Sequence, residues 1–337
     1  MKECFSGKKI LVTGGTGSIG SEIVRQVIKY DPETVRIYSN DEDAQFNAAQ
    51  EFGFKGKVRF LFGDVREEER LKWAMQDIDF VFHAAALKHV PGCEFDPFEA
   101  VKTNVIGTQN VIKEAIAQGV SKVINISTDK AVNPINVMGA TKLLAERISI
   151  SANNYRGSNR TIISNVRFGN VLASRGSVIP IFLKQIREGG PVTITDPEMT
   201  RFVMSIQQSV GLILKAAIEA KGGEIFILKM PALKIGELAE VMIEKYAAKY
   251  GQDPRRLKIV EIGMRPGEKF HEELMTHIEV TNAMEDEQMF VVMPDILDKA
   301  LKKNGLALTE YNSSRAKLLN RDEILKVLDD LEARETR

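Results

Sequence analysis

The chain is poor in cysteine, and this excludes several kinds of site. Its 337 residues include two cysteines, Cys4 and Cys93. Two thiols are too few for a disulfide framework or, by themselves, for a four-ligand zinc site. No spacing of histidine, cysteine and carboxylate side chains suggests another metal. We therefore expect no metal centre, and a reducing compartment, the cytoplasm.

Excess charge and long apolar runs are missing as well. The 46 Lys and Arg residues balance the 46 Asp and Glu residues, so no basic excess indicates a nucleic-acid partner. No apolar run approaches the ~18 residues of a membrane span. Met1–Lys9 is polar and leads directly into a predicted strand. We expect neither membrane insertion nor a signal peptide.

The first half of the chain alternates short β-branched runs with longer amphipathic stretches. Such alternation is typical of βαβ units around a parallel sheet. The runs predict strands at Lys9–Thr13, Thr34–Tyr38, Val58–Phe62, Phe80–His83, Lys122–Ile126 and Thr161–Val166. The stretches predict helices at Ser18–Lys29, Phe98–Gln118 and Val137–Ala152. The expected fold class is α/β, with a Rossmann-type doubly wound parallel sheet.

The pattern changes after Arg167, where Gly, Ser and Pro become frequent. The later predicted elements are helices at Ile206–Ala220, Glu237–Tyr250 and Asp322–Arg337, a strand at Glu224–Leu228 and a loop at Gly263–Lys269. We predict a dinucleotide-binding domain over residues 1–170, with residues 198–228 crossing back to it. Residues 171–197 and 229–337 are predicted to form a smaller C-terminal α/β substrate-binding domain.

The turn after the first predicted strand has the spacing of a dinucleotide-binding loop. Gly14, Gly17 and Gly20 follow a G-x-x-G-x-x-G pattern between a strand and a helix. Glycine permits a tight turn and a close approach to a pyrophosphate, which the helix N-terminus attracts. An ordinary glycine-rich turn is the alternative. The residues of this turn assigned to the cofactor are Gly14, Thr16, Gly17, Ser18, Ile19 and Gly20.

Other strand ends fit the same ligand, because open α/β sheets bind ligands at the carboxyl ends of their strands. Asp64, beside Val65, could accept a hydrogen bond from the adenine amino group. Small side chains after the fourth strand would let the cofactor lie close. Either loop could instead be a helix cap or a packing position. The further cofactor assignments are Ser39, Asn40, Asp41, Asp64, Val65, Ala84, Ala85, Ala86, Lys88, Asn104 and Lys142.

The end of the second strand bears on the choice of cofactor. An acidic residue there would bind the ribose 2′-hydroxyl and repel a 2′-phosphate. Ser39 takes that place, whereas Asp41 lies further on and could cap the next helix. We predict NADP, with NAD as the alternative, although no arginine lies nearby to clamp a 2′-phosphate.

Polar residues after the fifth strand resemble the active site of extended short-chain dehydrogenase/reductases. That superfamily places Ser or Thr after this strand, and Tyr-x-x-x-Lys on one face of the next helix. Thr128 and Lys142 match, while Met138 stands at the tyrosine position. Without the resemblance, Asp129 would be a turn residue, Lys130 a solvated lysine and Met138 a packing residue.

From Lys9 to about Leu325 the chain resembles, more narrowly, the short, soluble UDP-N-acetylglucosamine 4,6-dehydratases of polysaccharide biosynthesis. The strings that carry this resemblance are Ala84–Pro91, Ser127–Ala131, Gly169–Val171, Ser174–Pro180, Thr195–Phe202 and Arg265–Lys269. Tyr311-Asn312-Ser313 favours the capsular, C5-inverting branch, some of whose members also carry Met-x-x-x-Lys.

The resemblance implies a reaction in which the nicotinamide is reduced and reoxidised within one turnover. Asp129 would be the acid at the 6-hydroxyl and Lys130 the base at C5. Thr128 would hold the 4-hydroxyl, and Lys142 would bind the nicotinamide ribose. Lys130 must then be neutral through a lowered pKa, and Asp129 must be protonated through a raised one.

The implied substrate is UDP-N-acetylglucosamine, and guanidinium groups suit its diphosphate. Each arginine also has a plain surface interpretation. The assigned substrate residues are Lys88, Asn170, Val171, Arg175, Ser177, Val178, Arg201, Arg265 and Glu268.

Two other functions stay open. One is a C5-retaining dehydratase, and the other is a catalytically silent NADP-binding scaffold, for which Met138 is the support. A simple 4-epimerase would leave Asp129 and Lys130 without a task. Family similarity also implies a homo-oligomer such as a hexamer.

Overall fold

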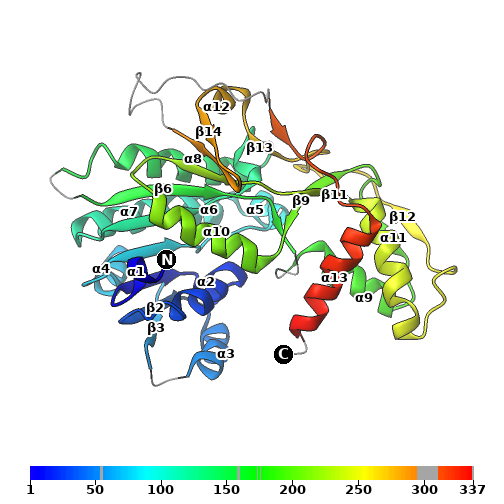
Figure 1. Cartoon of the computed structure of the whole chain (residues 1–337), viewed down its shortest axis with the longest axis horizontal. Helices are drawn as coiled ribbons and strands as arrows, with labels where there is room; N and C mark the ends of the chain where they lie inside the picture. The colour runs from blue at the N-terminus through cyan, green and yellow to red at the C-terminus, as the bar shows by residue number, and fades with distance from the viewer. Residues whose placement is uncertain (54–55, 158–159, 173, 175, 294–309, 336–337) are drawn as a thin grey trace.

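A nine-stranded sheet organises the chain (Figure 1). The structure is a computed structural model that describes residues 1–53, 56–157, 160–172, 174, 176–293 and 310–335. The strand order is β14-β15-β10-β6-β5-β4-β1-β2-β3. The sheet consists of β1 (Lys9–Thr13), β2 (Thr34–Ser39), β3 (Val58–Phe62), β4 (Phe80–His83), β5 (Lys122–Ile126), β6 (Ile162–Arg167), β10 (Ile225–Leu228), β14 (Ala283–Glu285) and β15 (Met289–Val292).

The strands from β3 to β10 are parallel, whereas β15 runs antiparallel to both β10 and β14. Runs such as Ile10-Leu11-Val12 are wholly buried, as expected for parallel strands covered on both faces. The Rossmann-type α/β prediction is therefore confirmed.

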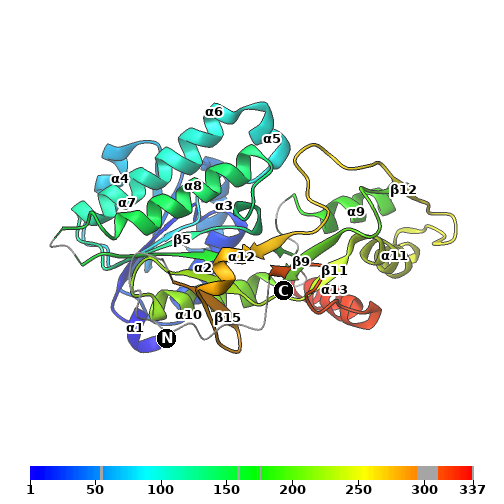
Figure 2. The same ribbon diagram turned by 90° about the horizontal axis from the view of Figure 1, so that it is seen from above.

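Helices cover both faces of this sheet. In Figure 2, α7 and α8 lie side by side on one face, while α2 and α10 lie on the other. Their bounds, with those of the other helices of this lobe, are α1 (Lys2–Phe5), α2 (Ser18–Ile28), α3 (Glu42–Phe52), α4 (Glu68–Ala74), α5 (Val90–Phe95), α6 (Pro97–Ala100), α7 (Gly107–Ala117), α8 (Val137–Ala152), α10 (Ile206–Glu219) and α12 (His277–Thr281). In the part of the chain that is described, no helix is both long and apolar enough to span a bilayer.

The predicted helix Phe98–Gln118 is not one continuous α-helix. Between α6 and α7 the chain forms one wide turn, η1 (Val101–Ile106), with π-helical geometry. Such turns insert a residue and re-aim a side chain, and hydrophobic periodicity does not reveal them. Here the buried side chain of Asn104 reaches the loop that follows β4.

A second, smaller lobe holds short sheets and three longer helices, α9, α11 and α13, visible together in Figure 1. It has its own apolar core, which includes Phe182, Met242 and Leu328. The elements outside the main sheet are β7 (Asn170–Val171), β8 (Val192–Ile194), β9 (Thr200–Met204), β11 (Ala232–Lys234), β12 (Ile259–Glu261), β13 (Glu273–Met275), β16 (Tyr311–Asn312), α9 (Val178–Arg187), α11 (Ile235–Tyr246), η3 (Ala248–Tyr250) and α13 (Arg321–Glu335).

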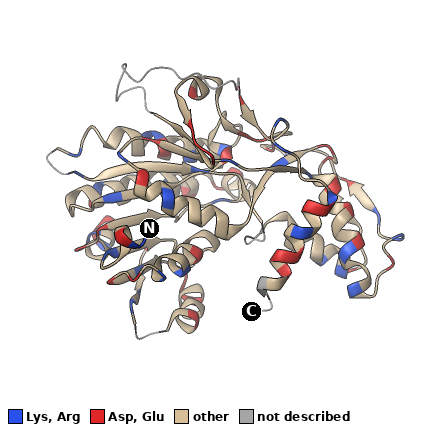
Figure 3. Cartoon of the chain, in the orientation of Figure 1, with Lys and Arg blue, Asp and Glu red and all other residues tan. Residues whose placement is uncertain are grey.

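The predicted boundaries of this lobe need adjustment. Residues 229–337 were assigned to it, yet β14 and β15 pair with β10 and extend the main sheet. The helix predicted at Glu237–Tyr250 ends at Tyr246 and continues as η3. The last two residues of the predicted terminal helix lie outside the described residues. Figure 3 shows charges of both signs interspersed over the two lobes.

A buried arginine joins three elements of the large lobe. Arg167, the last residue of β6, is 1% exposed and pairs with Glu146 of α8 through Nε (3.0 Å) and Nη2 (2.6 Å). Its Nη1 and Nη2 also donate to Glu279 of α12 at 3.0 Å each, and Nη1 donates to the Leu274 carbonyl at 2.9 Å. Because Glu146 lies on α8, one turn after Lys142, this cluster fixes the helix that carries the predicted active-site lysine.

Candidate active site

The glycine turn after β1 packs tightly enough to require glycine. Gly14 has φ +64°, and a Cβ there would lie 2.7 Å from the Ala85 amide nitrogen. A Cβ on Gly20 would lie 2.2 Å from the Gly14 carbonyl oxygen. The turn thus holds backbone close to the loop after β4 and leads into α2, whose N-cap is Gly17. This cradle fits a dinucleotide pyrophosphate at a helix N-terminus.

At the end of β2, side chains bind one another. The Thr16 and Ser39 hydroxyl oxygens lie 2.9 Å apart, and the Asp41 carboxylate caps α3 by accepting from the Ala44 amide. Helix-capping by Asp41, one of the two interpretations of this residue, is therefore seen. Asn40, Asp41, Glu42 and Asp43 are all exposed.

Asp64, after β3, is held by neighbouring polar groups. Its Oδ2 accepts from Asn40 Nδ2 at 2.9 Å and from Arg66 Nη2 at 2.6 Å. Burial opposes ionisation, but the hydrogen bonds from Arg66 and Asn40 hold the pKa of Asp64 below its usual value. The carboxylate is therefore an ionised acceptor, beside the buried Val65.

The side chain of Asn104 is hydrogen-bonded to other residues of the protein. Its Oδ1 accepts from the Leu87 amide at 2.8 Å, and its Nδ2 donates to the Leu87 carbonyl and to Thr141 Oγ1, both at 3.0 Å. The side chain is 1% exposed. Asn104 therefore supports the Ala84–Lys88 loop, while Ala86 and Lys88 are exposed.

Helix α8 buries both residues of its Met-x-x-x-Lys motif. Met138 is 3% exposed and packs with Cys93 and Ala100, so it occupies a packing position. Lys142 donates to the Ile126 carbonyl, at the end of β5, at 2.6 Å. Burial lowers the pKa of Lys142 to about 8, although Glu146 acts in the opposite direction.

The burial of Lys142 should make the free energy of unfolding depend on pH. Lysines of the unfolded chain titrate near 10.4, so from about pH 8 upward the folded protein has lost a proton that the unfolded chain keeps. The free energy of unfolding should therefore rise over this interval, by up to about 3 kcal/mol, and Lys142→Met should remove the rise. Urea unfolding between pH 8 and 10.5 measures it, with exposed Lys72→Met as control. An undiminished rise in Lys142→Met would contradict the assignment.

Asp129, Lys130 and Glu272 form a buried ionisable cluster. Lys130 Nζ lies 3.0 Å from Asp129 Oδ1 and 3.1 Å from Glu272 Oε1. Thr128 Oγ1 also donates to Asp129 Oδ1, at 2.8 Å. The side chains of Asp129 and Glu272 are 0% and 3% exposed, against 24% for Lys130. Asp129 and Lys130 lie in η2 (Asp129–Ala131), after β5, and Glu272 immediately precedes β13.

The protonation states within this cluster differ in part from expectation. Burial, with the nearby Glu272 charge, raises the pKa of Asp129, as an acid catalyst needs. Burial would lower the pKa of Lys130, but Asp129 and Glu272 outweigh it and raise the pKa above the usual value. The expectation of a lowered Lys130 pKa is therefore wrong for this arrangement, because the carboxyl groups of Asp129 and Glu272 lie 3.0 and 3.1 Å from its Nζ.

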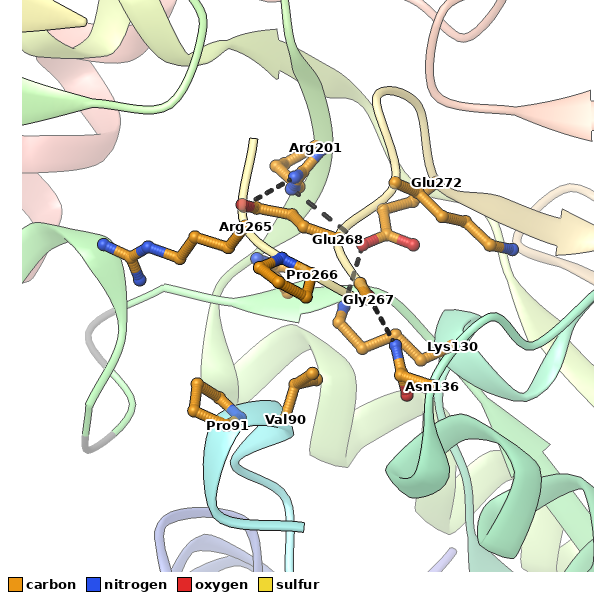
Figure 4. A pocket seen from close by; sticks show the side chains of 12 residues that line it. Val90, Pro91, Lys130, Asn136, Arg201, Arg265, Pro266, Gly267, Glu268 and Glu272 are labelled. Carbon is orange, nitrogen blue, oxygen red and sulfur yellow. Dashed lines mark hydrogen bonds and ion pairs between the residues drawn. The ribbon is translucent and has the colours of Figure 1, made fainter. Parts of the chain in front are cut away.

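A pocket of about 190 Å³ lies between the lobes and is shown in Figure 4. Lys130, Asn170, Arg201, Arg265, Glu268 and Glu272 contribute to its wall, whereas Asp129 lies beneath Lys130 and does not. The loop Gly263–Lys269, predicted from sequence, forms one side. Asn136 Nδ2 donates to the Gly267 carbonyl at 2.7 Å, and Lys269 Nζ donates to the Val132 carbonyl at 2.6 Å.

Arg201, predicted to bind a diphosphate, has protein partners instead. Its Nη1 donates to the carbonyls of Thr200 and Phe270, and its Nη2 pairs with Glu268 at 3.1 Å. The side chain is 7% exposed, so the arginine stabilises the wall of the pocket from within the protein. In Figure 4, Arg265 points away from this network. Among the described pocket residues it is the exposed guanidinium without an ion pair.

The other predicted substrate residues are spread more widely. Asn170 of β7 lines the pocket, while Val171 is buried. Ser177 is the N-cap of α9 and Val178 is its first residue, and neither lines this pocket. Arg175 lies outside the described residues. Glu272 was missed, because no spacing rule connects it with Asp129 and Lys130.

Comparison with known proteins identifies the family of this chain. A family model described as polysaccharide biosynthesis protein matches residues 10–294. A Bacillus thuringiensis protein of known structure, Pen, is 46% identical, with a TM-score of 0.90 over 97% of this chain and 98% of that one.

Similar sequences carry different names. A Methanocaldococcus jannaschii protein named as an uncharacterized membrane protein is 56% identical over 97% of each chain. An inverting UDP-N-acetylglucosamine 4,6-dehydratase from Campylobacter jejuni is 43% identical over 87% of this chain and 84% of its own. A UDP-glucose 4-epimerase from Rickettsia canadensis is 40% identical over 96% of each.

Proposed function

This chain belongs to the polysaccharide biosynthesis protein family, and from that membership we propose that it is a C5-inverting UDP-N-acetylglucosamine 4,6-dehydratase. The observation that carries the proposal is the cluster of Asp129, Lys130 and Glu272, of which Lys130 and Glu272 line the pocket. Loss of water from C5 and C6 of a 4-keto sugar needs a base and an acid close together. The Campylobacter jejuni relative, named as inverting, supports the stereochemistry.

In this proposal each side chain has a task. A bound nicotinamide would supply the acceptor and later the donor of the hydride that moves from C4 to C6, and water takes the proton of the 4-hydroxyl as C4 is oxidised. Lys130 removes the C5 proton, which the 4-ketone has acidified, and Asp129 protonates the departing 6-hydroxyl. Thr128 orients Asp129 through its 2.8 Å hydrogen bond. Lys142, anchored on the Ile126 carbonyl, holds the nicotinamide ribose, and Arg265 meets the diphosphate.

A 4-epimerase is the alternative that the names of the Rickettsia relatives raise. An epimerase exchanges hydride and proton at C4 and leaves C5 and C6 unchanged. The paired Asp129 and Lys130 would then have no reaction to serve, so their retention favours the dehydratase.

Incubation with UDP-N-acetylglucosamine in D2O, followed by NMR of the product, tests the proposal. We expect a 4-keto-6-deoxy sugar with deuterium and inverted configuration at C5. Retained configuration would identify the C5-retaining dehydratase, and a 4-epimer would identify an epimerase. Cofactor binding without any product would favour the silent scaffold.

For the cofactor we propose NAD, the alternative to the NADP that the position of Ser39 favoured. The Ser39 hydroxyl is already within 2.9 Å of the Thr16 hydroxyl, and the exposed residues that follow are Asn40 and three acids. Arg66, the nearby guanidinium, is paired with Asp64 and Glu99. Among the described residues at this edge, a 2′-phosphate would therefore meet negative charge and no unpaired cation.

Titration of the protein with NAD and NADP, followed by fluorescence or calorimetry, should give the tighter binding to NAD. Placing a guanidinium at this edge with Asn40→Arg should raise NADP affinity by about tenfold and change NAD affinity little. Lys72→Arg, on the exposed face of α4, is the matched control. Tighter NADP binding by the unaltered protein would overturn this choice.

A further inference from the structure

Glu272 is held rigidly against the pocket by its own backbone. Its amide donates to Ser313 Oγ at 2.9 Å, and its carbonyl accepts from the Ser313 amide at 2.8 Å. Ser313 is wholly buried and also bonds to Thr200. The carboxylate therefore has a fixed position beside Lys130, as Figure 4 shows.

The two oxygens of this carboxylate have different surroundings. Oε1 lies 3.1 Å from Lys130 Nζ and 3.9 Å from Arg201 Nε. Oε2 is buried and has no hydrogen-bond partner. A buried carboxylate oxygen without a donor is costly when charged and much less so when the group is protonated. The group is therefore an ion-pair partner that also has room for a proton.

Lys130 needs such a partner to act as a base. An ammonium cannot remove the C5 proton, so Lys130 must first release a proton to a neighbour. Asp129 is not available as the acceptor, because burial and the nearby Glu272 charge raise its pKa and its carboxyl group holds a proton of its own. The remaining acceptor within hydrogen-bond distance among the described residues is Glu272.

We propose that Glu272 is a positioning residue that takes the proton Lys130 must release, which leaves Lys130 as base while Asp129 keeps its own proton as acid. The inference rests on the proposed dehydratase function. In the resting cluster Asp129 is neutral, Lys130 positive and Glu272 negative. The proton moves from Lys130 Nζ to Glu272 Oε1, and the summed charge of the cluster stays zero.

The remaining proton transfers then balance. Neutral Lys130 takes the C5 proton and becomes an ammonium, and Asp129 gives its proton to the 6-hydroxyl, which leaves as water. Once the hydride has reached C6, solvent protonates C5 from the opposite face, and Glu272 returns its proton through Lys130 to Asp129. Burial opposes the charge of Glu272, but Lys130, Arg201 and Lys269 together hold its pKa below the usual value, so Glu272 is ionised until Lys130 releases its proton. Arg201 is already paired with Glu268 and Lys269 with the Val132 carbonyl, so both can stay in place while the proton moves.

Glu272→Gln tests this role, because the amide keeps the shape and cannot take the proton. We expect product formation to fall about 10²–10⁴-fold with KM within about threefold, while oxidation at C4 still gives a burst of reduced nicotinamide at 340 nm. Glu272→Asp should recover part of the rate. Glu273→Gln, which changes the adjacent carboxylate outside the cluster, should behave as the unaltered protein. A wild-type rate in Glu272→Gln, or loss of the burst together with the product, would overturn the proposal.

A second measurement does not depend on turnover. NMR titration of labelled lysine, with the Lys130 resonance assigned through Lys130→Arg, reports the charge coupling directly. In Glu272→Gln the Lys130 pKa should fall, whereas in Glu273→Gln it should stay. If the unaltered protein makes no dehydrated product but this shift is seen, the proposed function fails and the coupling stands. An unshifted Lys130 sinks the inference whatever the reaction.

Discussion

Asp129→Asn should lower the rate of 4-keto-6-deoxy product formation by about 10²–10⁴-fold, the usual contribution of a general acid. Asp129 is wholly buried, and burial with the Glu272 charge raises its pKa. The carboxyl group can therefore hold a proton for the departing hydroxyl, and a carboxamide has no such proton. Lys130 keeps Glu272 as its partner in this variant, so binding of the nucleotide sugar should change little.

The pH profile distinguishes an acid from a structural residue. Asp129 is competent while protonated, so the wild-type rate should fall as pH rises through its raised pKa. The residual rate of Asp129→Asn should lack that fall. Asp196→Asn serves as control, because its carboxylate caps the Glu198 amide in a nearby loop. An Asp129→Asn variant with the wild-type profile would remove Asp129 from the reaction.

Arg167→Met should cost about 3–5 kcal/mol of unfolding free energy, the usual loss when one partner of a buried ion pair is removed. The change leaves Glu146 and Glu279 without the guanidinium that now makes two contacts to each. The side chains of these acids are 1% and 11% exposed, so water compensates little. Chemical unfolding followed by circular dichroism measures the loss.

A combined variant separates unpaired charge from lost packing. Glu146→Gln and Glu279→Gln, added to Arg167→Met, remove both orphaned carboxylates and should restore part of the stability. Arg255→Met, whose side chain is 91% exposed, should stay within about 0.5 kcal/mol of the parent. If Arg167→Met itself costs less than about 1 kcal/mol, the cluster does not hold α8 and α12 to β6.

The sequence was a good guide where local pattern determines structure. The runs from Lys9 to Ile126 gave the first five strands to within a residue, because fully buried parallel strands read as continuous β-branched segments. The glycine spacing at Gly14–Gly20 likewise located the turn that requires glycine. The π-helical turn at Val101–Ile106 escaped, since its hydrophobic period is close to that of an α-helix.

The sequence was a weaker guide where distant residues decide the chemistry. Arg201 carries a guanidinium that could bind a phosphate, but in the folded chain this group is bound to the Glu268 carboxylate and to two backbone carbonyls. Lys130 was expected to lose its charge on burial, and the sequence did not reveal that Glu272 lies beside it and raises its pKa. Both errors have one cause: the charge of a buried group depends on partners that only the tertiary fold brings near.

The chain passes back and forth between the two lobes, and this affects how the protein unfolds. Strand β6 pairs with β10, and β10 pairs with β15, although the chain enters the second lobe between β6 and β10 and again between β10 and β15. A fragment ending near residue 170 would therefore expose the edge of β6 and lose α10 from one face of the sheet. Neither lobe is a separable module, so the molecule should unfold in one cooperative transition.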